Sequence, residues 1–216
     1  MKKYILILFS FFTLNSFAQF TTVDLFNTPV NIGYGQNGYY YKDVTGYFNQ
    51  FIGTWQYQNG TTTYTLQFKK QTFLKSYPHV NKTYQKDYLI GALKVVKNGV
   101  LIYNDLPALN QTFAEAVNYK IFSTGRVENF NDCYMCTYPN QRLHLWYYEP
   151  NNDNYAFEDL GFMIHTYTQN GVVKLRMDFL DQTSPSDFTN FKDSNSPPTK
   201  TSLFMDFGIF DFVKVP

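Results

Sequence analysis

Two cysteines carry the most specific chemical signal in the chain. Cys133 and Cys136 stand in the stretch CYMC, a spacing that suits a small-loop disulfide, a thioredoxin-like redox pair or half of a metal site. A redox pair needs a helix directly after it to activate the first thiol, but the residues that follow, TYPNQ, interrupt a helix. Zinc needs four ligands, and the chain has no second cysteine pair. We predict a structural disulfide, and the redox and metal roles stay open as alternatives.

A second candidate site combines two histidines, a tryptophan and an arginine. His144 and Trp146 alternate along one predicted strand, His165 lies in the next strand and Arg176 in the one after that. If the three strands pair in chain order, these side chains form one polar and aromatic patch. Such a patch suits a sugar or an anion, because it offers an aromatic platform with planar donors. The alternative, which we favour, is the ordinary polar outer face of a half-buried sheet.

Signatures of catalysis are missing from the sequence. It has no Gly-x-Ser-x-Gly elbow, no His-Glu-x-x-His and no phosphate-binding loop. Glu158 and Asp159 are adjacent, so in a strand they point to opposite faces and cannot work as a carboxylate pair. A glycosidase-type pair on separate strands leaves no local signature, and this alternative stays open. We expect no catalytic residues, no cofactor and no metal site.

The first eighteen residues have the pattern of a signal peptide. Two lysines precede an apolar run over residues 4–14, and a small-x-small cleavage site ends at Ala18. The apolar run is too short to span a bilayer, and no later segment is apolar for long enough. We predict cleavage between Ala18 and Gln19, a mature chain without a transmembrane segment, and export to the periplasm or the medium.

The composition is typical of one β-rich globular domain. Removal of residues 1–18 leaves 216 − 18 = 198 residues, and the loss of two lysines gives a net charge of 16 − 17 = −1. The chain has 22 Phe and 19 Tyr against five Met, which favours strands, because aromatic side chains fit a pleated surface. A net charge near zero offers no electrostatic basis for binding nucleic acid.

Alternating apolar residues predict an antiparallel meander of about eight strands that forms a lipocalin-like barrel or a strongly curled sheet. We expect these strands at 51–58, 63–68, 86–96, 100–104, 142–149, 160–168, 172–180 and 202–215. Asn-Gly pairs at 59–60, 98–99 and 170–171 favour tight hairpin turns.

Other segments lie outside this meander. Residues 19–42 are rich in Asn, Gly and Tyr and are expected to form an exposed loop or a loose edge strand ahead of one domain over 43–216. Residues 105–127, with a short helix around 112–118, and a long loop over 182–202 are expected to interrupt the meander.

The stretch 43–70 predicts how one end of the barrel is closed. Asp43 can cap a helical turn over 43–51, because apolar residues there recur at helical spacing. Gly53 and Trp55 then begin an alternation whose apolar face must oppose Tyr64, Leu66 and Phe68. We interpret both as structural residues, with Trp55 facing the interior at the closed end and Gly53 leaving room for a close approach.

This arrangement, with Gly53-x-Trp55 on the first strong strand after a helical turn, resembles the lipocalin-like (calycin) barrels. The resemblance implies a barrel that binds small apolar molecules in its mouth. Such barrels place an arginine late in the chain across the tryptophan, whereas here the last strand has Lys214, and Arg176 lies one strand earlier.

The stretches FIGTWQY, LIGALKVVKNGV and LGFMIHTYTQNGVVKLRM, in this order, are similar to a group of uncharacterised exported β-rich proteins of Bacteroidota. That resemblance implies an exported origin and a fold type, but no activity.

Two functions follow as hypotheses. The first is an exported binding module for a small apolar or aromatic ligand, or for a glycan. The second is an envelope-associated or secreted protein that binds another protein without a small-molecule ligand. A barrel binder is expected to have an enclosed apolar pocket that reaches Trp55 and Tyr57, whereas an interaction protein is expected to have a filled core and an exposed aromatic patch.

Overall fold

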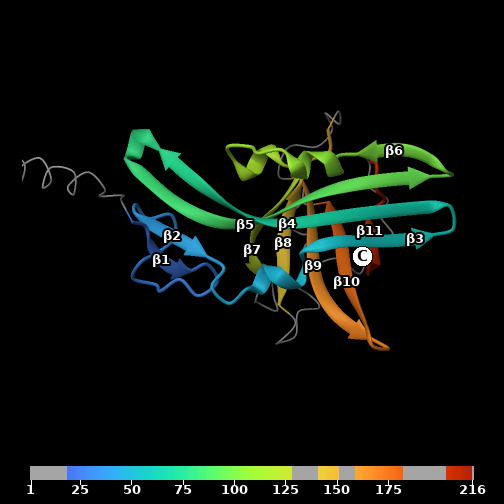
Figure 1. Ribbon diagram of the computed structural model, residues 1–216, viewed down its shortest axis with the longest axis horizontal. Coiled ribbons are helices and arrows are strands. Elements are labelled where there is room, and N and C mark those ends of the chain that lie inside the picture. Colours follow the sequence, from blue (N-terminus) through green and yellow to red (C-terminus); the bar gives the residue numbers. More distant parts are fainter. Residues whose placement is uncertain (1–18, 128–140, 151–158, 182–202, 216) are drawn as a thin grey trace, which may run out of the picture.

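The computed structural model describes residues 19–127, 141–150, 159–181 and 203–215, and these residues form eleven strands and four short 3-10 helices (Figure 1). The strands are β1 (Thr21–Asp24), β2 (Tyr39–Lys42), β3 (Gly53–Asn59), β4 (Thr62–Tyr77), β5 (Lys82–Lys97), β6 (Val100–Asn104), β7 (Ile121–Val127), β8 (Arg142–Tyr147), β9 (Leu160–Gln169), β10 (Val172–Asp181) and β11 (Gly208–Val215). The helices are η1 (Tyr47–Gln50), η2 (Pro78–Val80), η3 (Leu106–Asn110) and η4 (Ala116–Asn118). In this part of the chain, no helix has the length and apolar character needed to cross a membrane.

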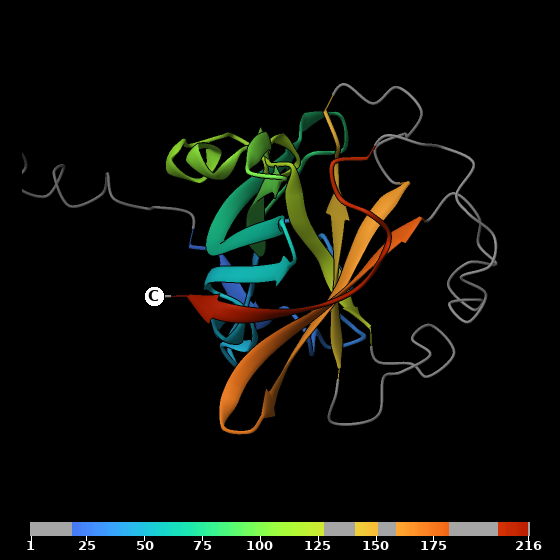
Figure 2. The same ribbon diagram turned by 90° about the vertical axis from the view of Figure 1, so that its right-hand side faces the viewer.

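Eight of the strands close into an antiparallel barrel. Their order around the barrel is β5, β4, β3, β11, β10, β9, β8 and β7, and β7 pairs again with β5. Figure 2 shows the β9–β10 side in orange opposite the blue-green β3–β5 side. The predicted all-β fold with an eight-stranded antiparallel barrel is therefore confirmed.

The barrel interior is filled with side chains. Every one of the eight strands contributes buried apolar residues to a single core, which Phe48 and Phe51 of the η1 segment complete. At Gly91 the packing is so close that an added Cβ would lie 2.7 Å from the Phe68 ring. This interior is a packed core in the manner of small barrels.

Strand β5 pairs with β4 along its whole length and has three successive partners along its other edge. It pairs in parallel with β2 at Gln85 and Lys86, then antiparallel with β7 at Ile90 and Gly91, then antiparallel with β6 over Lys94–Lys97. The first half of β5, together with β4, therefore extends beyond the barrel as a two-stranded arm, which Figure 1 shows reaching over β1 and β2.

The segment 19–42 is more ordered than an exposed loop or a loose edge strand. Strands β1 and β2 pair in parallel, and Val23, Tyr41 and Tyr84 form a small core between this segment and the arm. The Tyr41 side chain is fully buried, and its hydroxyl accepts a hydrogen bond from the Gln36 amide and donates one to the Gly33 carbonyl. A tyrosine that satisfies its hydroxyl in this way can serve as a core residue.

Two of the three predicted hairpin turns lie where expected. Asn98–Gly99 and Asn170–Gly171 all have positive φ angles, as type I′ turns require. The first hairpin differs, because Asn59 pairs with Thr62 and the loop is Gly60–Thr61, with a positive φ at Gly60. The pairing of β3 with β4 is therefore displaced by two residues from the predicted pairing. Because side chains alternate between faces with a period of two, Trp55 still lies on the predicted face.

The prediction that residues 105–127 interrupt the meander of strands is wrong for residues 121–127. Residues 106–110 and 116–118 form η3 and η4 instead of one helix around 112–118, and residues 121–127 form the barrel strand β7. Leu109, Ala116 and Tyr119 pack with Phe122 in a second core on the outer face of the barrel. The alternation of β7 is weak, because Ser, Thr and Gly occupy its centre, and its pairing with β8 defines it.

Candidate functional site

A cavity of about 650 Å³ lies where the β4–β5 arm diverges from β7; we call it the fork pocket. Its walls come from the segment 25–34, the arm, η4 with the preceding Glu115, and strands β7 and β8. The wall is largely aromatic and includes Phe26, Tyr34, Tyr77, Tyr84, Tyr88, Phe122 and Trp146. This size and lining suit a small organic molecule.

A buried lysine stands in this aromatic wall. Lys86 is only 6% exposed, and its Nζ lies 4.9 Å from the centre of the Tyr34 ring and 4.5 Å from that of Tyr88. The same nitrogen donates a long hydrogen bond of 3.4 Å to the Thr124 carbonyl. Burial, followed by the nearby positive charge of Lys75, lowers the pKa of Lys86 to about 8. The ammonium is therefore still the main form at neutral pH.

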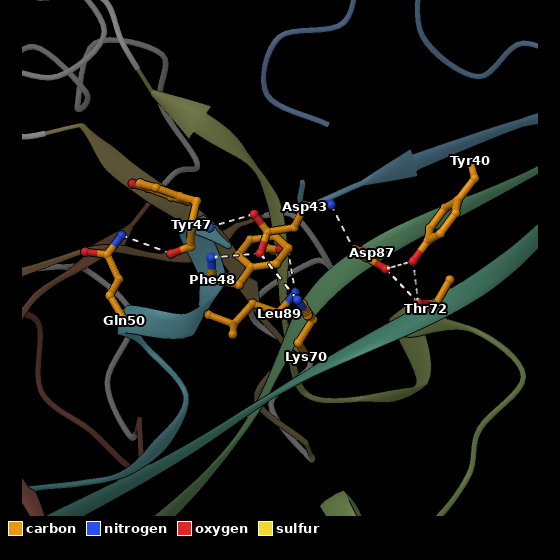
Figure 3. A network of polar contacts seen from close by, with 10 residues as sticks. Tyr40, Asp43, Tyr47, Phe48, Gln50, Lys70, Thr72, Asp87 and Leu89 are labelled. Atoms are coloured by element: carbon orange, nitrogen blue, oxygen red, sulfur yellow. Dashed lines mark hydrogen bonds and ion pairs between the residues drawn. The ribbon is translucent and has the colours of Figure 1, made fainter. Parts of the chain in front are cut away.

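The carboxylate next to Lys86 in the sequence lies on the opposite face of the arm. Neighbouring residues of a strand alternate between faces, so Asp87 points away from the fork pocket. Its oxygens accept hydrogen bonds from the Tyr40 hydroxyl at 2.7 Å, from the Thr72 hydroxyl at 2.6 Å and from the Asp43 amide at 3.0 Å (Figure 3). The Asp87 carboxylate therefore makes its hydrogen bonds on the face of the arm that is turned away from the fork pocket.

The network in Figure 3 also fixes the segment between β2 and β3. The Asp43 carboxylate accepts hydrogen bonds from the amides of Tyr47 and Phe48 at the start of η1, and Lys70 lies 3.6 Å from it. Asp43 therefore binds the first amides of a helical turn as predicted, but the turn is a 3-10 helix over Tyr47–Gln50 with Gly46 at its N-cap, instead of a turn over 43–51. Together, Asp43 and Asp87 hold β2 and η1 against the arm.

The charges around the fork pocket are mostly positive. Lys75, Lys86, Arg126 and Glu115 line it, which is three cations and one carboxylate. Glu115 accepts a hydrogen bond from Lys75 at 3.1 Å. Arg126 stacks on the rings of Phe26 and Tyr47 at 5.0 and 5.5 Å. Among the lining residues, the single carboxylate is therefore bound to Lys75.

The predicted patch of four residues divides into two groups on the outer face of the barrel. His144 shares a hydrogen bond of 2.6 Å between its Nδ1 and the Thr124 hydroxyl, and Trp146 meets Phe122 edge to face at 5.5 Å. Thr124, Trp146 and Phe122 line the fork pocket. Of the predicted patch, Trp146 therefore lines the fork pocket, and His144 supports the pocket wall through its hydrogen bond with Thr124.

His165 and Arg176 form the second group, directly opposite each other on β9 and β10. Arg176 donates two hydrogen bonds of 2.9 Å to Asp211, so its planar fork is already occupied. Burial and the charges of Arg142 and Arg176 lower the pKa of His165 to about 4. Arg142 is itself ion-paired with Asp178. The two ion pairs occupy most of these charges, but Arg142 Nε, His165 Nδ1 and Asp178 Oδ1 are buried without a hydrogen-bond partner among the described residues, so the network is only partly satisfied.

Trp55 lies in the barrel core with no exposed surface. Its indole N–H donates a hydrogen bond of 2.7 Å to the Phe51 carbonyl, next to η1. Lys214 of the last strand pairs with Trp55 and places its Nζ 5.3 Å from the ring centre. Gly53 has a φ of +119°, and a Cβ there would lie 3.0 Å from Lys214 Cε. These contacts are packing contacts of the barrel, as expected for two structural residues.

Several predicted features lie outside the described residues. These are Cys133 and Cys136, the signal peptide before Gln19, and the loop 182–202. The disulfide and the cleavage after Ala18 stay predictions. Within the described ranges, no three His, Cys, Asp or Glu side chains gather in a way that could hold a metal ion.

The residues that distinguish the pocket were not predicted from the sequence. Tyr84, Lys86 and Tyr88 alternate in the stretch YQKDY and therefore share one face of β5. A lysine between two tyrosines on one face of a strand is a signal that could have been found. The fork itself leaves no local pattern, because it depends on the pairing of β5 with β2 and β7.

Comparison with known proteins identifies a family and gives no activity. The chain belongs to the family of unknown function DUF6705, which matches residues 1–185. No curated protein and no solved structure shows a significant match.

Proposed function

Because membership of this family leaves the activity open, we propose from the geometry that the protein is a binding module for a small organic ligand with an aromatic or apolar body. The ligand occupies the fork pocket outside the barrel, and the filled barrel interior has a purely structural role. The proposal keeps the binding function expected from the sequence and moves its site away from Trp55 and Tyr57, which do not line the pocket.

The observation that carries the proposal is the combination of volume and lining in one place. The fork pocket is partly open to solvent, has a volume of about 650 Å³ and is lined by eight aromatic side chains, which is the size and lining of a small-molecule site. Tyr34 lines this pocket, packs on Tyr41 and Tyr84 with part of its ring, and is 53% exposed, so the rest of its surface can contact a ligand. Aromatic side chains offer such contact area at a low cost in conformational entropy.

Gly125 provides the test, since it lines the pocket and a Cβ there meets nothing within 4 Å. A Gly125→Phe variant is expected to fold normally and to fill part of the pocket. Binding of a neutral naphthalene probe, followed by calorimetry, is expected to weaken at least about tenfold. Thr168→Phe, on an exposed end of β9, is the control and should leave binding unchanged. Equal binding by wild type and Gly125→Phe would show that the probe does not use this pocket.

A second candidate function is binding of a protein partner through β6. Val100, Leu101 and Ile102 are all exposed on this strand, which lies at an edge of the described sheet. Exposed apolar edge strands are ready to pair with another chain. A photo-crosslinker at Leu101, in protein from the compartment where it resides, is expected to capture a partner that the same group at Val173 does not. Equal labelling from the two exposed positions would remove this candidate.

We also propose that the protein is exported and that Cys133 and Cys136 form a disulfide. The support is the tripartite N-terminus and the close cysteine spacing in a chain bound for an oxidising compartment. Mass spectrometry of the exported fraction is expected to find a chain that begins at Gln19. Alkylation without reductant is expected to modify neither thiol. A chain that retains residues 1–18, or two freely alkylated thiols, would overturn the respective proposal.

A further inference from the structure

We propose that the fork pocket selects ligands that carry an anionic group, and that Lys86 holds this group by direct contact. This inference rests on the proposed function, because it names the class of molecule that the same pocket takes. The ligand is an aromatic or apolar molecule with a carboxylate, or a group of equal charge and size, at one end.

The first argument is the burial of Lys86 without a counter-charge. Its side chain is more than nine-tenths buried, and within the described residues it makes no ion pair. Its contacts are two tyrosine rings and one long hydrogen bond to a carbonyl. A buried ammonium without an anion is costly, so a ligand that supplies the anion relieves this cost, while the desolvation of its own charge offsets part of the gain.

The second argument is that the neighbouring carboxylates are already bound. Asp87 faces the other side of the arm and accepts three hydrogen bonds there. Glu115 lines the pocket but is paired with Lys75. Neither can reach Lys86 without breaking its own contacts. Among the described residues, therefore, no carboxylate is left to pair with Lys86 Nζ, and we assign that position to the anion of a ligand.

The third argument is the shape of the surroundings. Tyr34 and Tyr88 flank the ammonium with their rings, and Tyr84 meets Tyr34 edge to face at 5.9 Å. An anion on Lys86 would place the rest of its molecule among these rings. Glu115 balances the charge of Lys75, so Arg126 is the further cation of the pocket that adds a favourable field for a negative ligand. Both features favour a flat organic anion over a bare inorganic ion.

The test compares 2-naphthoate with 2-naphthamide, two probes of nearly equal shape that differ in charge. Calorimetry on the purified full chain is expected to show at least about tenfold tighter binding of naphthoate, the range of a charge-assisted hydrogen bond. In Lys86→Met the naphthoate advantage is expected to vanish, while naphthamide binds as before. Lys94→Met, on the same face of the same strand but outside the pocket, is the control and should keep the advantage.

The outcomes separate this inference from the proposed function. If both probes bind equally to wild type, or if the advantage survives in Lys86→Met, the anion inference is overturned while the binding module stands. If neither probe binds wild type, the proposed function fails and the inference fails with it. Circular dichroism and a melting curve for Lys86→Met exclude loss of fold as the cause of lost naphthoate binding.

Discussion

Replacing Lys86 with methionine is expected to stabilise the protein at neutral pH. Methionine keeps the length and flexibility of the side chain but removes a charge that is buried in an aromatic wall. Each unit of difference between two pKa values corresponds to about 1.4 kcal/mol, so a drop from 10.5 to about 8 corresponds to about 3 kcal/mol. Loss of the contacts with Tyr34 and Tyr88 offsets about 1 kcal/mol of this gain. The expected net gain is about 2 kcal/mol.

The pH dependence gives a sharper test, because it isolates the titration of Lys86. Its pKa is lower in the folded state, so between about pH 8 and 10.5 the unfolded chain binds more protons than the folded chain. The stability of the wild type therefore rises with pH across this window. From pH 7 to pH 9.5 it is expected to gain about 2 kcal/mol relative to Lys86→Met.

Urea unfolding at several pH values, followed by tryptophan fluorescence, measures both effects. Lys94→Met is the matched control and should run parallel to the wild type. The reasoning is refuted if Lys86→Met is less stable than the wild type at pH 7 and shows the same slope, because the ammonium must then have a counter-charge in the folded protein.

Three further predictions concern the barrel and its outer face. Trp55→Ala is expected to lower the free energy of unfolding by about 3–5 kcal/mol, because Trp55 is in the core. Trp146→Ala is expected to lower it by less than half as much, because Trp146 is only half-buried. Thermal melts that show equal losses of stability in the two variants would contradict this assignment. Gly53→Ala is expected to destabilise by more than about 1 kcal/mol, since φ is +119° and the new Cβ would press on Lys214, and a neutral effect in urea titrations would count against this strain. Burial raises the pKa of Asp105 to about 6, so the wild type loses stability as pH rises from about 4 to 6. Asp105→Asn should remove this loss and gain about 1–2 kcal/mol at pH 7, and a mutant that parallels the wild type over this range would disprove the argument.

The parts of the fold that follow a local pattern could be predicted from the sequence. Alternation placed Trp55 on the inner face, and it did so even though the turn at Gly60 shifts the register by two residues. Asn98-Gly99 and Asn170-Gly171 marked their hairpins, because few other residues adopt two consecutive positive φ angles at low cost.

The parts that depend on distant pairing could not be predicted in this way. The strand β7 has a weak pattern of its own and exists because β8 and β5 pair with it. The fork pocket arises where β5 exchanges β7 for β2, a parallel contact between residues more than 40 positions apart. For this reason the sequence pattern indicated residues with familiar chemistry, such as His165 and Arg176, and did not indicate Lys86.

The closure between β5 and β7 has a consequence for how the molecule opens over time. Two residue pairs join these strands, against ten between β9 and β10, so this seam has the fewest backbone hydrogen bonds around the barrel. Side chains reinforce it, since the Ser123 hydroxyl accepts a hydrogen bond from the Leu89 amide and Lys86 reaches the Thr124 carbonyl. Local unfolding begins where such protection is thinnest, so amide hydrogens at this seam are expected to exchange with solvent before those of the other barrel strands. A ligand bound between Lys86 and β7 would contact both strands of the seam, so its binding is expected to slow the exchange of these amide hydrogens.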